Sequence, residues 1–304
     1  MPLSSAIENT GASYTADIRY SAKGYWRVGG LISHHAEVQT IDQLRSLIQL
    51  GEPLHILGNG SNMLMSDLGV RGVAVSLKGS FLEWSLSEDS QSIWVGAGLR
   101  NTVLLNGLKK ATLGGLAALA GVPGTIGGAI RMNAGTALGE IGDSVLAVEW
   151  IDRETGQLHQ YDKATCGFQY RKATGLPWSA IVTRVHFTVS PRSEEMQNKV
   201  RHHLQRRKET QPLHLPSCGS VFTNPAGDYA GRLIESVGLK GRQIGQAQIS
   251  DKHANFIVNL GGASAMDVYQ LMRLAKSTVH RETGVTLHPE VKPIGQWSEG
   301  LWPL

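Results

Sequence analysis

A glycine-dense stretch near the middle of the chain places the strongest constraint on the fold. Residues 119–135 read LAGVPGTIGGAIRMNAG and contain five glycines and one proline, with Arg131 as the one charged side chain. Glycine and proline at this density are unfavourable inside a regular helix or strand. The stretch therefore predicts irregular backbone that either crosses tightly between packed elements or lies against a ligand, and its residues alone leave both alternatives open.

Length and composition indicate a soluble, globular, enzyme-like protein with about two domains. The chain has 304 residues, 41% of them hydrophobic and 18% charged, and its 36 glycines exceed the usual share of about 7%. Cys166 and Cys218 have no C-x-x-C or Cys/His ligand spacing, which argues against a disulfide scaffold and a structural zinc. We find neither a secretory signal nor a membrane-spanning apolar run, so we expect a cytoplasmic protein with no metal and no membrane insertion.

The net charge of +4 favours an anionic partner, either a nucleic acid or a phosphorylated small molecule. The densest basic cluster is RHHLQRRK, residues 201–208, which we interpret as the solvated face of a helix. No zinc finger, aromatic RNP stripe or helix-turn-helix accompanies it, so we predict no nucleic-acid partner.

The order of helix and strand signals predicts an α+β fold in three regions, 1–79, 80–190 and 191–304. In the first, residues 40–51 predict a helix capped by Thr40, followed by strands in 53–57 and 72–77. In the second, we expect a helix in 100–115, a hairpin turning at 154–156 and a strand in 180–190. In the third, we expect helices in 193–211, in 230–238 and in 264–284, the last with a Ser264/Asp267 capping box, and a strand in 285–291.

Two loops are candidates for binding a phosphorylated ligand. In LGNGSN, residues 57–62, Gly58 and Gly60 allow backbone N–H groups to converge as they do around a pyrophosphate. Met63 stands where the dinucleotide fingerprint needs a third glycine, so the pattern alone favours a plain turn over a phosphate loop. The second loop is the glycine-dense stretch, whose backbone could lie directly against a flat ring or a diphosphate.

Three further residues could take part in chemistry. Arg171, in QYRKA, could bind a carboxylate or phosphate with its planar fork. Ser220, in PSCGSVFTNP, does not fit the G-x-S-x-G nucleophile elbow, and Glu290, in LHPEV, faces either a cleft or water. Alternatively, Arg171 is an ordinary exposed arginine, Ser220 is a turn residue and Glu290 faces water.

Taken together and in order, these motifs resemble the UDP-N-acetylenolpyruvoylglucosamine reductase family, the MurB flavoenzymes of bacterial cell-wall synthesis. The matching segments are WRVGG, LGNGSNMLMSD, LAGVPGTIGGAIRMNAG, QYRKA, GSVFTNP, AGRLIESVGLKG, ISDKHANFIVN and LHPEV. The chain is similar to the compact type that lacks an extra tyrosine loop. It departs from the family at Thr223, where many members carry a basic residue.

The resemblance implies a two-part FAD-binding module of the vanillyl-alcohol-oxidase (PCMH) type, formed by 1–79 and 80–190, and a C-terminal α+β substrate-binding domain, 191–304. It implies catalytic roles for Arg171, Ser220 and Glu290. The implied substrate-binding residues are Tyr170, Asn224 and Gln248. The implied contacts to non-covalent FAD are Gly58, Asn59, Gly60, Ser61, Asn62, Pro123, Gly124, Thr125, Gly127, Gly128, Asn133 and Gly135.

The resemblance also implies a reaction, the reduction of UDP-N-acetylglucosamine enolpyruvate to UDP-N-acetylmuramate by a monomer. NADPH would reduce the flavin and leave, and the sugar nucleotide would then enter and be reduced, in a ping-pong sequence. Ser220 would donate the final proton, while Arg171 and a protonated Glu290 would stabilise the carboxylate. Two alternatives remain, a non-covalent flavin oxidase of the same superfamily and a flavin-binding homologue without activity.

Overall fold

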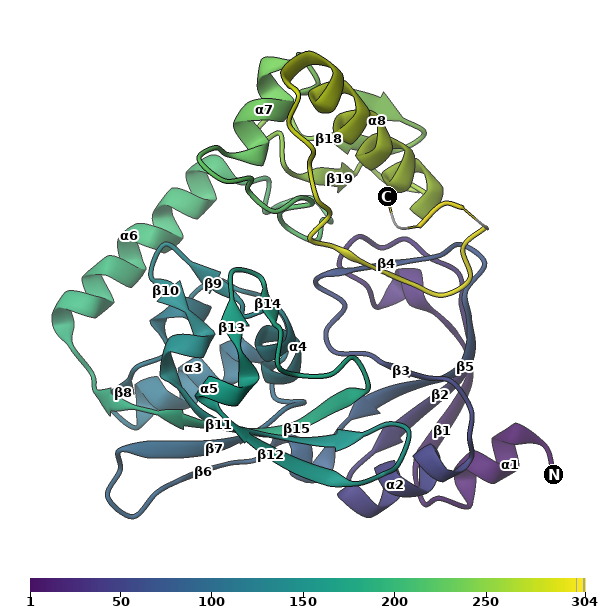
Figure 1. Cartoon of the computed structure of the whole chain (residues 1–304), viewed down its shortest axis with the longest axis vertical. Coiled ribbons are helices and arrows are strands. Elements are labelled where there is room, and N and C mark those ends of the chain that lie inside the picture. The colour runs from purple at the N-terminus through teal and green to yellow at the C-terminus, as the bar shows by residue number, and fades with distance from the viewer. Residues whose placement is uncertain (299, 303) are drawn as a thin grey trace. The chain divides into compact units, whose positions relative to one another are not determined.

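The computed structural model describes residues 1–298, 300–302 and 304, which form two compact units (Figure 1). The first unit combines residues 1–16, 34–59 and 72–206. The second unit combines residues 17–33, 60–71 and 207–304. The chain passes from the first unit to the second between Asn59 and Gly60, inside the LGNGSN loop. The three-region division at residues 79 and 190 stays a prediction.

A five-stranded antiparallel sheet forms the centre of the first unit. Its strand order is β12-β11-β15-β7-β6, and all neighbouring strands run antiparallel. The strands are β6 (Trp84–Leu86), β7 (Ser92–Gly96), β11 (Val145–Asp152), β12 (Leu158–Asp162) and β15 (Ala180–Thr188). The predicted hairpin between β11 and β12 is confirmed, and the Asp152 carboxylate accepts the backbone N–H groups of Glu154 and Thr155 in its turn.

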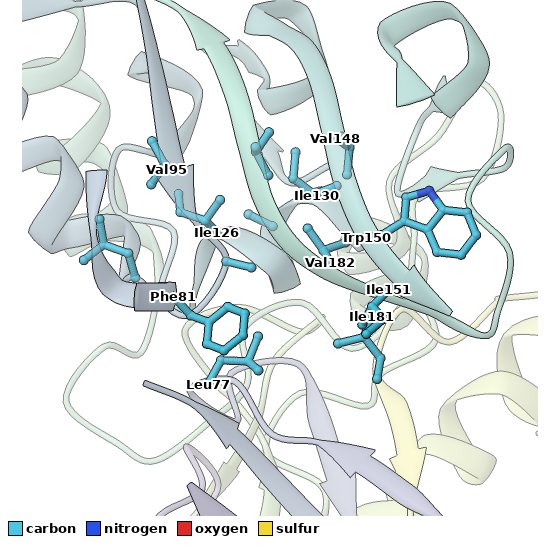
Figure 2. Packing of buried hydrophobic residues seen from close by; sticks show 14 of the residues in the cluster. Leu77, Phe81, Val95, Ile126, Ile130, Val148, Trp150, Ile151, Ile181 and Val182 are labelled. Carbon is cyan, nitrogen blue, oxygen red and sulfur yellow. The ribbon is translucent and has the colours of Figure 1, made fainter. Parts of the chain in front are cut away.

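A short helix, α4 (Ile126–Arg131), lies within the glycine-dense stretch, so the prediction of irregular backbone throughout it is wrong. Thr125 begins the helix by accepting the N–H of Gly128 with its hydroxyl. Ile126 and Ile130 are four residues apart and therefore share one helix face, and both are fully buried. Figure 2 shows them packed among side chains of the central sheet. This apolar face holds a helix that glycine alone would not stabilise.

The predicted helices in 40–51 and 100–115 and the predicted strands in 53–57 and 72–77 are confirmed, whereas the strands in 13–19 and 31–38 were not predicted. Helix α2 (Ile41–Gln49) has Thr40 as its N-cap, and α3 (Asn101–Lys110) occupies the predicted range. A four-stranded sheet has the order β1-β2-β5-β3. Its strands are β1 (Ser13–Arg19), β2 (Leu31–Val38), β3 (Leu54–Ile56) and β5 (Val70–Leu77), and the smaller elements, which were not predicted, are α1 (Leu3–Glu8), β8 (Leu113–Gly114), β9 (Gly135–Thr136), β10 (Gly139–Glu140), α5 (Lys163–Cys166), β13 (Phe168–Gln169), β14 (Lys172–Ala173) and β16 (Ser190–Pro191).

The second unit is built around one long helix, α8 (Ala265–Thr283). The predicted Ser264/Asp267 capping box is present, and the Asp67 carboxylate accepts the N–H groups of Ala265 and Met266. These acceptors satisfy the donors that a helix N-terminus leaves unpaired. The other elements are β4 (Met63–Met65), α7 (Ala230–Ser236), β17 (Gln243–Ile244), β18 (Ala247–Ile249), β19 (Ile257–Asn259) and β20 (Lys292–Ile294).

Helix α6 (Glu194–Thr210) carries the basic cluster and contains residues of both units. None of its residues is buried. This exposure fits the interpretation of the cluster as a solvated helix face.

The predicted strand in 285–291 is wrong. The structure has one isolated pairing there, Phe222 with Pro289, and the strand begins only at Lys292 as β20. Proline has no backbone N–H, so Pro289 cannot extend a regular ladder. Residues before β20 therefore run beside the Phe222 segment without forming a sheet.

Candidate active site

Residues 57–59 of the LGNGSN loop lie beside the glycine-dense stretch in the first unit. A Cβ added to Gly58 would lie 2.9 Å from the Thr125 hydroxyl oxygen. Gly124 has a φ of +118°, and its carbonyl accepts the N–H of Asn101 at the start of α3. The fold thus joins LGN, residues 57–59, to PGT, residues 123–125, as the resemblance implies for one cofactor bed.

Glycine occupies positions 127 and 128 for different structural reasons. Gly127 packs against the central sheet, because its N–H donates to the Ala97 carbonyl and its Cβ would lie 3.1 Å from the Ala97 Cβ. Gly128 is exposed, and its Cβ would meet nothing closer than the Thr125 hydroxyl at 3.6 Å. Close packing therefore explains the absence of a side chain at position 127. Position 128 has room for a side chain, so packing does not explain why a glycine exposes its backbone there.

Gly60 begins the part of the loop that belongs to the second unit. Its φ is +67°, and an added Cβ would lie 2.5 Å from the Tyr20 hydroxyl. That hydroxyl is buried and has no hydrogen-bond partner among the described residues. Burial, with a smaller contribution from Cys218, raises the pKa of Tyr20. Gly60 is buried too, so close packing on Tyr20 explains why this position has no side chain.

Ser220 and Glu290 lie on neighbouring segments of the second unit. The Glu290 N–H donates to the carbonyl of Val221, the residue after Ser220, over 2.8 Å. Ser220 itself pairs with Phe256, and the Thr223 N–H donates to the carbonyl of His288. Both residues are partly buried. Residues far apart in sequence are therefore fixed close together by backbone hydrogen bonds.

Asn255 holds the Ser220 segment from the other side. Its amide oxygen accepts the Phe222 N–H at 3.0 Å, and its amide nitrogen donates to the Phe222 carbonyl at 2.8 Å. Asn255 and Phe222 are both buried. This reciprocal pair fixes the backbone two residues after Ser220.

Replacing Asn255 with alanine should lower the free energy of unfolding by about 2–4 kcal/mol, because two buried backbone groups lose their partner at about 1–3 kcal/mol each. Urea unfolding followed by circular dichroism measures this change. The exposed Asn106→Ala in α3 is the control and should change stability by less than about 1 kcal/mol. An equally small change for Asn255→Ala would contradict the assigned role.

Arg171 and Tyr170 form the tight turn between β13 and β14 in the first unit. Arg171 has a φ of +60°, an uncommon conformation for a residue with a side chain. Its guanidinium donates to the Gly135 carbonyl at 3.3 Å and lies 4.8 Å from the centre of the Tyr170 ring. Tyr170 is exposed. A two-residue hairpin turn requires such a backbone conformation, so the catalytic role of Arg171 stays a prediction.

Asn133 and Gly135 are used inside the fold. The buried Asn133 amide donates to the Glu140 carboxylate and the Gln169 carbonyl, and accepts the Gly142 N–H. A Cβ on Gly135 would lie 2.6 Å from the Gly139 carbonyl. Direct contact of these two residues with FAD stays a prediction, because the structure accounts for both as parts of the loop scaffold.

The remaining predicted site residues occupy different settings. Asn59, Ser61 and Pro123 lie in the two loops and are partly buried. The carbonyl oxygen of the Asn224 side chain accepts the N–H of Ala230 at the start of α7, and the Gln248 side chain donates to the Gly241 carbonyl. Substrate contact by Asn224 and Gln248 stays a prediction.

Cys218 packs behind the loop, with its thiol 3.5 Å from the Gly60 carbonyl and 3.7 Å from the Met63 carbonyl. Burial raises the pKa of this thiol to about 12, and burial also raises the pKa of Cys166, to about 11. Both cysteines are buried inside the fold, where neutral thiols of this kind act as packing groups.

Folding stability should fall as pH rises above about 9, because both thiols ionise more easily in the unfolded chain, whose pKa is about 8.5. The loss grows as pH approaches the folded values of about 11 and about 12. Urea midpoints at pH 7 and pH 10 measure the effect, and Cys166→Ala/Cys218→Ala should weaken it. A double variant with the same pH dependence as the parent would show that other groups dominate.

Sequence reasoning missed Tyr20, Cys218 and Asn255. The last lies in ISDKHANFIVN, one of the matching segments, but no local pattern shows that its side chain pairs with Phe222. Within the described residues there is no cluster of three or more histidine, cysteine or acidic side chains able to hold a metal ion. Among the same residues, no helix has the length and apolarity needed to cross a membrane.

Comparison with known proteins shows the family. Residues 211–294 match the family described as UDP-N-acetylenolpyruvoylglucosamine reductase, C-terminal domain, and residues 32–162 match the FAD binding domain. The chain is 42% identical over 283 residues to UDP-N-acetylenolpyruvoylglucosamine reductase 2 of Symbiobacterium thermophilum, covering 91% of this chain and 89% of that protein.

Solved structures agree with the sequence comparison. The crystal structure of UDP-N-acetylenolpyruvylglucosamine reductase (MurB) from Thermus caldophilus superposes with a TM-score of 0.80 at 37% identity, covering 93% of this chain and 98% of that one. A berberine bridge enzyme variant, a reticuline dehydrogenase, shares the fold with a TM-score of 0.51 at 16% identity, over 73% of this chain and 52% of that one. The α+β fold with an FAD-binding module is thereby confirmed, and the chain belongs to the UDP-N-acetylenolpyruvoylglucosamine reductase family.

Proposed function

We propose that this chain reduces UDP-N-acetylglucosamine enolpyruvate to UDP-N-acetylmuramate with NADPH, and that it does so in the cytoplasm as a monomer. The observation that carries the proposal is the backbone link between the Ser220 and Glu290 segments, the Glu290 N–H to Val221 carbonyl hydrogen bond of 2.8 Å. Family membership supplies the reaction, and this link supports two residues acting on the same group of the substrate.

The residues present fit FAD. Gly58 and Gly128 are exposed and carry no side chain, so the first unit offers open backbone that a diphosphate or a ring system could approach closely. When bound, FAD supplies the hydride chemistry between NADPH and the enolpyruvyl group. LGNGSN contains no histidine to tether a flavin covalently, so we propose non-covalent binding.

The side chains would stabilise the negative charge that develops on the substrate and would supply the final proton. Hydride addition to the terminal alkene carbon leaves negative charge on the adjacent carbon and its carboxylate. Arg171, which is always charged, would neutralise that carboxylate, and Glu290 in its protonated form would donate a hydrogen bond to it. Ser220 would donate a proton to the carbon and complete the lactyl ether. Thr223 cannot supply the charge that a basic residue would, and its hydroxyl donates to the His288 carbonyl instead.

A steady-state assay tests the proposal. Anaerobic NADPH consumption should depend on the enolpyruvyl sugar nucleotide, with one lactyl product formed per NADPH. Consumption of dioxygen with an alcohol substrate would instead support the flavin oxidase. Flavin binding without turnover of either substrate would support the inactive homologue.

A further inference from the structure

The side chain of Asn62 connects the loop to Glu290. Its amide nitrogen donates to the Glu290 backbone carbonyl at 3.2 Å, and its own backbone carbonyl accepts the Lys292 N–H at 3.0 Å. All three residues belong to the second unit. Asn62 is therefore bonded on both sides of Val291, the residue that follows Glu290.

The link continues into a parallel strand pair. Immediately after Asn62, β4 pairs with β20, with Met63 opposite Lys292 and Met65 opposite Ile294. In Figure 1 the yellow C-terminal segment runs beside β4. Asn62 is thus the first residue of a continuous contact between the loop and the segment that follows Glu290.

Glu290 is held at both ends of its own peptide unit. Its N–H donates to the Val221 carbonyl, and its carbonyl accepts from Asn62. The first bond aligns Glu290 with the Ser220 segment, and the second aligns it with the LGNGSN loop. A backbone fixed from both sides gives the Cα–Cβ bond of Glu290 a defined direction, and this limits the region that its carboxyl group can reach during the reaction.

We propose that Asn62 is a positioning residue for Glu290, and that its side chain serves this role in place of contacting FAD. The proposal rests on the proposed function. It reassigns the Asn62 amide, which the resemblance implies to be a cofactor contact. The backbone of the LGNGSN loop would still contact the cofactor. Asn62 would therefore link this loop to Glu290.

The test uses the FAD-loaded enzyme and four variants. Asn62→Asp keeps the shape of the side chain and removes the donor, and Asn62→Ala removes the donor without adding charge. Asn106→Asp and Asn106→Ala make the same changes at an exposed position of α3. Stopped-flow absorbance follows flavin reduction by NADPH and reoxidation by the enolpyruvyl sugar nucleotide separately, and FAD affinity is measured by reconstitution.

Both Asn62 variants should slow the limiting rate of reoxidation by about 10- to 100-fold, because a small misplacement of a catalytic group has effects of this size. Flavin reduction, FAD affinity and the substrate concentration giving half the limiting rate should change by less than about 2-fold, as should every rate in the Asn106 variants. Weakened FAD binding with an unchanged reoxidation rate would overturn the proposal and restore Asn62 as a cofactor contact.

A double-mutant cycle separates positioning from general damage. In a Glu290→Gln background, Asn62→Ala should slow reoxidation by less than about 2-fold further, because it acts through a group already removed. Full additivity of the two effects would overturn the proposal, because it would mean that Asn62 affects reoxidation independently of Glu290. If the parent enzyme does not reduce the sugar nucleotide at all, the proposed function fails. If the parent is active and the Asn62 variants reduce the sugar nucleotide at the same rate, the positioning role alone fails.

Discussion

Replacing Ser220 with alanine should leave reduction of the bound flavin by NADPH unchanged and slow its reoxidation by the enolpyruvyl substrate by about 10²- to 10⁴-fold, the usual contribution of a positioned general acid. Ser220 is only partly buried, and its segment is fixed by backbone hydrogen bonds and by Asn255, so folding should not depend on its hydroxyl. The loss should therefore appear in one half-reaction alone.

Stopped-flow absorbance under anaerobic conditions measures both half-reactions. Ser277→Ala removes an exposed hydroxyl from α8 and should leave both rates at the parent level. Ser220→Cys retains a proton donor and should recover part of the reoxidation rate. Equal slowing of both half-reactions in Ser220→Ala would reject the role of proton donor.

Replacing Gly128 with valine should weaken FAD binding by about 10-fold or more, equivalent to about 1.4 kcal/mol, without lowering folding stability. The Cβ at this exposed position meets only the Thr125 hydroxyl at an ordinary contact distance, so the helix can accept a side chain. The added branches would occupy the space over the bare backbone that the cofactor is proposed to use.

Gly127→Val is the matched comparison. Here the Cβ would lie 3.1 Å from the Ala97 Cβ and 3.3 Å from the Ala97 carbonyl, so overpacking should destabilise the fold by about 1–3 kcal/mol. FAD titration and thermal unfolding of the apoprotein distinguish the two variants. If Gly128→Val binds FAD as tightly as the parent, the exposed face of α4 does not contact the cofactor.

Local signals predicted the five longer helices, the β11–β12 hairpin and strands β3, β5 and β15. The Thr40 cap, the hairpin after Asp152 and the Ser264/Asp267 capping box depend on neighbours within a few residues, and all three are present. The helix in the glycine-dense stretch was missed for the opposite reason. This helix is stabilised because Ile126 and Ile130 are buried against sheet strands that lie elsewhere in the sequence. The low helix propensity of glycine gives no sign of that burial.

Long-range pairing explains what the sequence could not predict. The two units interleave three stretches each, so the LGNGSN loop changes unit between Asn59 and Gly60 without any local signal. The pairing of Asn255 with Phe222 and the Asn62 bond to Glu290 join residues far apart in the chain. Motifs in the sequence therefore identified the candidate site residues. The residues that hydrogen-bond to them could be identified only from the folded structure.

The central claim is that this chain couples NADPH oxidation to reduction of the enolpyruvyl group through FAD. The most direct measurement is a single-turnover experiment under anaerobic conditions with purified FAD-loaded enzyme. One equivalent of NADPH should bleach the flavin spectrum, and one equivalent of UDP-N-acetylglucosamine enolpyruvate should then restore it, with one equivalent of UDP-N-acetylmuramate found by mass spectrometry. A flavin that NADPH bleaches but that only dioxygen restores would contradict the claim.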